Sequence, residues 1–226
     1  MEGMGSPEIK KIGIVGGTGK EGKGLAYRWS KAGYEVSIGS RQIEKAVAAA
    51  SEVNDLLKGE ICVTGLSNLD VANHADLVVM TVPFSVHKEM LEMLKPVVQG
   101  KIVIDVTVPL VPPKVTKVQM PSAGSAAQEA QNILGEGVHV CSAFQNISYE
   151  HLLRDEEVEC DVLVCGSSKA ARSEVLKLVS AAGLTGWDAG PIENSAVVEG
   201  MTSILIGINK QYGVQSAGIK ITGVTP

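Results

Sequence analysis

Residues 11–41 read KIGIVGGTGKEGKGLAYRWSKAGYEVSIGSR, and this stretch decides the fold. It opens with a short apolar run typical of a strand and passes directly into a glycine motif, Gly17-x-Gly19-x-x-Gly22. Apolar residues then recur at the spacing of a helix. The pattern predicts a strand, a tight glycine turn and a helix, in the order found in dinucleotide-binding βαβ units.

A turn of this kind is suited to a pyrophosphate group. Glycines let the backbone approach the phosphates closely, and the amides at the helix N-terminus point at their negative charge. Because strand, turn, helix and spacing agree, we expect a dinucleotide as the ligand. A glycine-rich surface turn that binds nothing is the alternative interpretation.

The end of the next predicted strand indicates which dinucleotide binds. In this fold an acidic residue at that position usually accepts hydrogen bonds from the ribose hydroxyls of NAD. Here the strand ends in Gly39-Ser40-Arg41, with no carboxylate. A guanidinium pairs well with a phosphate, and Ser40 and Lys45 can support it. We therefore predict a pocket for the 2′-phosphate of NADP; a solvated arginine is the alternative.

The composition bounds the class of protein. The chain has 226 residues, of which 45% are hydrophobic, enough for one domain or one domain with a small appendage. A net charge of −5, with scattered basic residues, predicts no nucleic-acid binding. No apolar run approaches the ~20 residues of a membrane span, and residues 1–10 lack a signal peptide's apolar segment. We expect a cytoplasmic protein with a tail at 1–10.

The cysteines and histidines show no metal-ligand pattern. The cysteines lie in apolar surroundings without the two-residue spacing of zinc or redox pairs, and the histidines have no companion ligands. We therefore expect free, buried thiols and no metal site. The four cysteines are Cys62, Cys141, Cys160 and Cys165.

Strand-like runs alternate with helical patterns along the whole chain. Strands are predicted at 11–15, 35–39, 61–65, 77–82, 101–106, 138–144 and 162–166, with a weaker one at 185–188. Helices are predicted at 21–32, 43–57, 69–74, 85–94, 123–134, 169–181 and 195–212. This alternation predicts an α/β, Rossmann-like, doubly wound and mostly parallel sheet with helices on both faces.

Two strand ends are candidate places for chemistry. Residues 81–84 lead from the fourth predicted strand into a proline turn, beside the expected nicotinamide end of the cofactor. Residues 107–109 follow the fifth strand and open a proline-rich loop, 107–122, over the same edge of the sheet. An ordinary strand exit, with Phe84 simply in the core, explains the first pattern equally well.

Several blocks of the sequence resemble, in the same order, the NADPH-dependent reductases of the deazaflavin coenzyme F420. The first is the glycine motif with its Ser-Arg ending, and the resemblance continues to the C-terminus. The later blocks are TVP at 81–83, AGSAAQE at 123–129, SAFQN at 142–146, CDVLVCG at 160–166, DAGP at 188–191, NSAVVE at 194–199 and AGIK at 217–220.

The resemblance implies a reversible hydride transfer between NADP(H) and coenzyme F420, an 8-hydroxy-5-deazaflavin. It implies NADP contacts at the pyrophosphate loop, at the 2′-phosphate pocket and beside the nicotinamide. These residues are Gly17, Thr18, Gly19, Lys20, Glu21, Ser40, Arg41, Lys45, Val82, Pro83, Val108 and Tyr149.

Direct hydride transfer needs positioned rings, so no catalytic nucleophile or metal is implied. Gln145 and Asn146 are candidate deazaflavin contacts that would act as hydrogen-bond donors to its pyrimidine ring. Capping of the loop after the sixth strand explains these two residues equally well.

The last predicted helix, 195–212, is apolar on more than one face. Packing against its own domain alone would leave apolar surface exposed, whereas a homodimer interface or a lid over the acceptor site would cover it. We therefore divide the chain into a Rossmann NADP-binding domain, 11–190, and a small C-terminal region, 191–226, that closes the acceptor cleft or pairs subunits.

Two other functions stay open on the sequence alone. The chain could be an NADP-binding module without catalysis, whose apolar C-terminal helix docks a partner. It could also be an NADP-dependent reductase of a flavin or a ferric acceptor. Each predicts a different response when NADPH is mixed with the oxidised deazaflavin.

Overall fold

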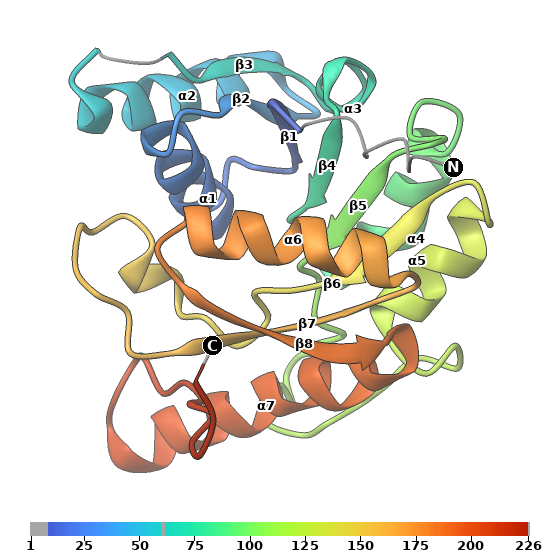
Figure 1. The fold of residues 1–226 in the computed structure, drawn as a ribbon, viewed down its shortest axis with the longest axis vertical. Coiled ribbons are helices and arrows are strands. Elements are labelled where there is room, and N and C mark those ends of the chain that lie inside the picture. The colour runs from blue at the N-terminus through green and yellow to red at the C-terminus, as the bar shows by residue number, and fades with distance from the viewer. Residues whose placement is uncertain (1–8, 60–61, 226) are drawn as a thin grey trace.

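The computed structural model describes residues 9–59 and 62–225. Within them, eight strands form one sheet in the order β3-β2-β1-β4-β5-β6-β7-β8 (Figure 1). The strands are β1 (Lys11–Val15), β2 (Glu35–Ser40), β3 (Thr64–Ser67), β4 (Leu77–Met80), β5 (Ile102–Asp105), β6 (His139–Ser142), β7 (Asp161–Gly166) and β8 (Thr185–Pro191). All neighbouring strands are parallel except β6 and β7. The predicted Rossmann-like, mostly parallel sheet is confirmed.

Helices cover both faces of this sheet. They are α1 (Lys20–Lys31), α2 (Ile43–Leu57), α3 (Asn68–His74), α4 (Phe84–Leu94), α5 (Ala126–Leu134), α6 (Lys169–Ala181) and α7 (Ser195–Tyr212), with short 3-10 turns η1 (Tyr149–His151) and η2 (Ile192–Asn194). One core cluster lies under α1, α2 and α6, and the other under α3, α4 and α5. The last helix, α7, packs against α5 and β7.

Three predicted boundaries are wrong by three residues. The strand predicted at 61–65 is β3, which begins at Thr64, and residues 60–61 lie outside the described part of the chain. The helix predicted at 123–134 begins only at Ala126, because the Ser125 hydroxyl accepts a hydrogen bond from the Gln128 amide and caps its N-terminus. The strand predicted at 185–188 continues to Pro191, since it pairs along β7 past a bulge.

The segment that connects β6 to β7 stays at the carboxyl edge of the sheet, because the chain reverses direction between these two strands. Because the two strands are antiparallel, the connection 143–160 starts and ends at the edge where β6 ends. A right-handed helical crossover would have carried the chain back to the opposite edge. Residues 145–152 therefore lie where β1, β4 and β5 also end.

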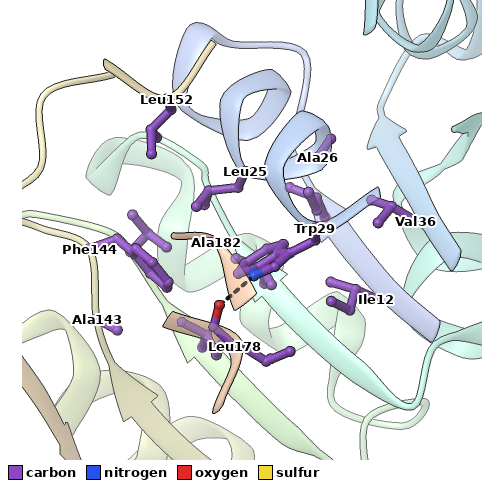
Figure 2. Close-up of a cluster of buried hydrophobic side chains, with 14 of the residues drawn as sticks. Ile12, Leu25, Ala26, Trp29, Val36, Ala143, Phe144, Leu152, Leu178 and Ala182 are labelled. Carbon is purple, nitrogen blue, oxygen red and sulfur yellow. Dashed lines mark hydrogen bonds between the residues drawn. The ribbon is translucent and has the colours of Figure 1, made fainter. Parts of the chain in front are cut away.

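A buried aromatic pair anchors the start of that connection. The indole of Trp29, on α1, meets the Phe144 ring edge to face, and both side chains are buried (Figure 2). Phe144 has a left-handed backbone with φ of 74°, a conformation that costs a non-glycine residue about 1–3 kcal/mol. Packing of its ring in the core holds this strained turn, which presents the two residues that follow it.

Candidate functional site

The glycine turn after β1 is held by the end of β2 and the start of α3. The Gly17 amide donates to the Gly39 carbonyl over 3.1 Å, and the Gly16 amide donates to Asn68 Oδ1 over 3.0 Å. A Cβ at Gly39 would lie 2.7 Å from the same Asn68 oxygen. The buried Asn68 side chain thus explains why a glycine precedes Ser40, and no pattern in the sequence marked this residue.

The geometry of the turn fits a bound pyrophosphate. A Cβ at Gly22 would lie 2.5 Å from the Gly17 Cα, so only glycine lets α1 pack this closely on the turn. At Gly19, by contrast, a Cβ would meet nothing within 4 Å. No side chain caps the N-terminus of α1 among the described residues, so its first amides are free to bind an anion.

The residues predicted to bind the 2′-phosphate lie together at the end of β2. Ser40 ends that strand, and its hydroxyl accepts a hydrogen bond from the Gln42 amide over 3.2 Å. Arg41 and Lys45 are exposed, and neither forms an ion pair with another described residue. Both cations are therefore available to a phosphate.

A cavity of about 420 Å³ opens where the strand ends meet α7. It brings together seven of the predicted site residues: Glu21, Val82, Pro83, Val108, Gln145, Asn146 and Tyr149. The glycine turn and the Ser40-Arg41 pair do not line it; they lie beside it along the same edge of the sheet. The predicted residues thus form a single strip, from the end of β2 to the cavity.

The structure also reveals a second wall of the cavity, whose residues the sequence did not identify. It comes from α7 and the segment after it, and its members are Thr202, Leu205, Ile206, Asn209, Gln215 and Ala217. The Thr202 hydroxyl donates to the carbonyl of Gln145 over 2.9 Å and so ties α7 to the opposite wall. The apolar pattern of this helix indicated a lid or an interface, but not which side chains face inward.

Gln145 and Asn146 are buried and each has an unpaired polar atom. Gln145 Nε2 donates to the Asp105 carbonyl over 2.7 Å, whereas its Oε1 has no partner among the described residues. The Asn146 Nδ2 also lacks a partner there. Buried polar atoms without partners cost about 1–3 kcal/mol each, so their presence in a cavity wall favours a polar ligand. Capping of the loop explains the bond made by Gln145 Nε2, but it does not explain the unpaired Oε1.

The turn η1 is attached to α1 by charged side chains. Lys20 Nζ lies 3.4 Å from Glu150 Oε1 and 4.7 Å from the centre of the Tyr149 ring. On the far side, Arg28 donates to the carbonyls of His151 and Leu152 at 2.9 and 3.0 Å. Two predicted contacts, Lys20 and Tyr149, therefore meet in space although they lie far apart in the sequence.

Glu21 lies in the first turn of α1 and reaches the cavity. Loss of water around its carboxyl raises the pKa to about 8. The group is therefore mainly protonated at neutral pH and adds little negative charge to the turn.

The described residues contain no cluster of three or more potential metal ligands. Cys141, Cys160 and Cys165 are free and buried, as expected, but Cys62 is exposed, so the prediction of a buried thiol is wrong there. Cys62 lies before the late-starting β3 and therefore outside the sheet. No helix in the described ranges is long and apolar enough to cross a membrane.

The chain matches known proteins along almost its whole length. Residues 11–109 match the family model described as "NADP oxidoreductase coenzyme F420-dependent". The F420-dependent NADP reductase of Methanocaldococcus jannaschii is 39% identical over 222 residues, covering 95% of this chain and 99% of the relative. That of Methanothermobacter thermautotrophicus is 39% identical over 223 residues, covering 96% of each chain.

A solved structure supports the fold. The crystal structure of a protein from Arthrobacter sp. FB24 superposes with a TM-score of 0.78 at 24% identity, covering 95% of this chain and all of that one. The sequence matches are strong enough to place the protein. The chain belongs to the family of F420-dependent NADP reductases.

Proposed function

We propose that this protein catalyses reversible hydride transfer between NADP(H) and coenzyme F420. One observation carries the proposal: a single cavity joins the end of the dinucleotide strip to a second wall built from Gln145, Asn146 and α7. Two ring systems that exchange a hydride need such a continuous space. The full-length similarity to F420-dependent NADP reductases supports the same conclusion.

The strip from β2 to the cavity would hold NADP. Arg41 and Lys45, with the Ser40 hydroxyl, would bind the 2′-phosphate. The turn from Gly17 to Glu21, with Thr18, Gly19 and Lys20, would hold the pyrophosphate, and the free amides of α1 would face its charge. Val82, Pro83 and Val108 would pack against the nicotinamide, with Tyr149 near its edge.

The site contains what a positioning mechanism requires. The nicotinamide and the deazaflavin supply the chemistry, a direct transfer of hydride from C4 of one to C5 of the other. The protein must bring these rings to about 3–3.5 Å and exclude water. The apolar side chains of Val82, Val108 and Leu205 line the cavity and would exclude water from the bound rings, and the unpaired amide atoms of Gln145 and Asn146 are available to orient a ring.

The C-terminal region would close the acceptor half of the cleft. In this division, 11–190 binds NADP and 191–226 supplies the wall over the deazaflavin. Of the tail expected at 1–10, residues 1–8 lie outside the described part of the chain. The outer face of α7 carries exposed apolar residues, among them Val197, Ile204 and Tyr212. We propose that a second copy of the chain covers this face in a homodimer.

We further propose that the protein works in the cytoplasm without nucleic-acid partners. Its buried cysteines are free thiols, which is typical of a reducing compartment, and its charge is −5.

The decisive experiment mixes the purified protein with NADPH and oxidised F420 and follows the visible absorbance of the deazaflavin. Bleaching is the expected result. If NADP binds tightly but F420 is not bleached, the chain is a binding module. If only a parallel sample with free flavin or a ferric chelate reacts, the acceptor assignment is wrong.

A further inference from the structure

A buried ion pair lies directly behind the cavity wall. His87, on α4, places its Nε2 2.7 Å from Asp105 Oδ2, at the end of β5. The two side chains are 0% and 1% exposed, and neither lines the cavity. Burial of two ionisable side chains is costly, so packing alone does not explain why this pair lies next to the cavity.

Asp105 connects this pair to the cavity through two hydrogen bonds. Its Oδ1 accepts the Thr107 amide over 3.0 Å, and its carbonyl accepts Gln145 Nε2 over 2.7 Å. Both Thr107 and Gln145 line the cavity. The position of Asp105 therefore sets the position of two wall residues in the loops that follow β5 and β6.

The bond to Asp105 determines which way the Gln145 amide faces. A carbonyl oxygen can only accept a hydrogen bond, so the nitrogen of the amide must face Asp105. The amide oxygen, Oε1, is then left as a buried acceptor without a partner among the described residues. Such an atom is suited to a ligand that presents an N–H group.

Two further ionisable groups, Glu129 and Glu199, lie beside the pair. Glu129, on α5, places Oε1 3.5 Å from His87 Nδ1. Glu199, on α7, is buried with its carboxylate on the Ala126 and Ala127 amides, and Asp105 helps to raise its pKa. Burial opposes a charged His87, but Asp105 and then Glu129 outweigh it, so the pKa of His87 is raised. Two acidic groups, Asp105 and Glu129, thus favour the imidazolium form.

We propose that His87 is a positioning residue: its imidazolium holds Asp105, and through Asp105 it holds the Gln145 amide with Oε1 directed to an amide-type N–H of the bound rings. The nicotinamide carboxamide and the pyrimidine part of the deazaflavin both offer such an N–H. The identity of these rings rests on the proposed function, whereas the coupling between His87 and Gln145 does not.

The first test uses the protein without substrates. NMR would follow the His87 imidazole and the Gln145 side-chain amide from pH 5 to pH 9. We expect the imidazole to titrate above its usual value of about 6.5 and the amide signal to shift with the same midpoint. Glu129→Gln should lower both midpoints together by up to about one pH unit. Separate midpoints, or an amide signal that does not move, would overturn the proposal.

The second test uses variants of His87. Glutamine places a neutral N–H where Nε2 lies, so His87→Gln should retain kcat within a few fold but lose its pH dependence. His87→Leu leaves Asp105 Oδ2 without its partner, although Oδ1 keeps the Thr107 amide, and should lower kcat roughly 10- to 100-fold. In the wild type, kcat should fall at alkaline pH as His87 loses its proton. If His87→Leu does not fold, Glu129→Gln still decides, because it should move this fall to lower pH. An unchanged kcat profile in His87→Gln and Glu129→Gln would contradict the proposal.

The kinetic constants also separate the two sources of the N–H. A larger rise of KM for NADPH in His87→Leu places the carboxamide at Gln145, and a larger rise for F420 places the deazaflavin there. Equal, small effects on both constants would refute the contact. If the wild-type protein does not reduce F420, the proposed function fails, and the NMR titration still tests the coupling.

Discussion

Trp29 and Phe144 pack edge to face with their ring centres 5.7 Å apart and their planes at 81°. Trp29 belongs to the helix that follows the glycine turn, and its Nε1 donates to the Leu178 carbonyl over 2.9 Å (Figure 2). Phe144 directly precedes Gln145. One contact in the core therefore links the dinucleotide helix to the residues of the opposite cavity wall.

This contact predicts the effect of Phe144→Ala. Loss of the buried ring should lower the free energy of unfolding by about 3–5 kcal/mol, measured by urea denaturation. Phe84→Ala is the matched control, since Phe84 is only partly buried and lines the cavity. Phe84→Ala should lower the free energy of unfolding by less than Phe144→Ala does, but it should raise the KM for a substrate that binds in the cavity. Equal stability losses would show that the Phe144 ring does not anchor the turn.

The phosphate pocket predicts a change of cofactor preference in Arg41→Asp. The variant loses a cation and gains a like charge, which should cost NADP binding about 2 kcal/mol, the low end of the range for charge pairs because Arg41 is exposed. The ratio of kcat/KM for NADPH and NADH measures it. Lys45→Ala should act in the same direction but less. An unchanged ratio in Arg41→Asp would contradict the assignment of the pocket.

The raised pKa of Glu21 leads us to expect that NADP binding depends on pH. Its pKa is raised to about 8, so the protonated form is favoured in the fold and the carboxylate appears as the pH rises through that value. Between pH 7 and 9 the dissociation constant for NADP should therefore increase, while the 2′-phosphate stays ionised throughout. Glu21→Gln should remove this increase. Calorimetry at both pH values measures it; a parallel increase in the variant would refute the role of Glu21.

The same raised pKa predicts an effect on stability. A carboxyl whose folded pKa lies above its unfolded value contributes stability below about pH 4.5 that is lost as the pH rises through 8. The melting temperature of the wild type should therefore fall relative to that of Glu21→Gln between pH 5 and 9. A constant difference over this range would show that the group does not titrate there.

The exposed face of α7 predicts the effect of a charge on assembly. Ile204 is 54% exposed, and Ile204→Glu should convert the proposed dimer to a monomer in light scattering without changing the melting temperature of the protomer greatly. Val47, which is 52% exposed on α2, provides the control. Val47→Glu should leave the assembly unchanged. A dimer that survives Ile204→Glu would place the interface elsewhere.

The sequence predicted well whatever depends on neighbours along the chain. The glycine turn, the Ser40-Arg41 ending and most helix boundaries follow from local spacing and backbone preference. The start of α5 was missed because the helical pattern continues upstream of its true cap at Ser125. The reversal of β7 was missed because the apolar pattern of a strand carries no information on its direction.

The sequence by itself determined that a strand, a glycine turn and a helix form a dinucleotide site, because those residues are adjacent and their conformations are local. Only the tertiary structure decided how the acceptor side is built. The contacts that orient Gln145 come from Asp105, 40 residues earlier, and Thr202, 57 residues later. No periodicity encodes such pairs, because they arise only when separate elements pack together and buried polar atoms must find partners.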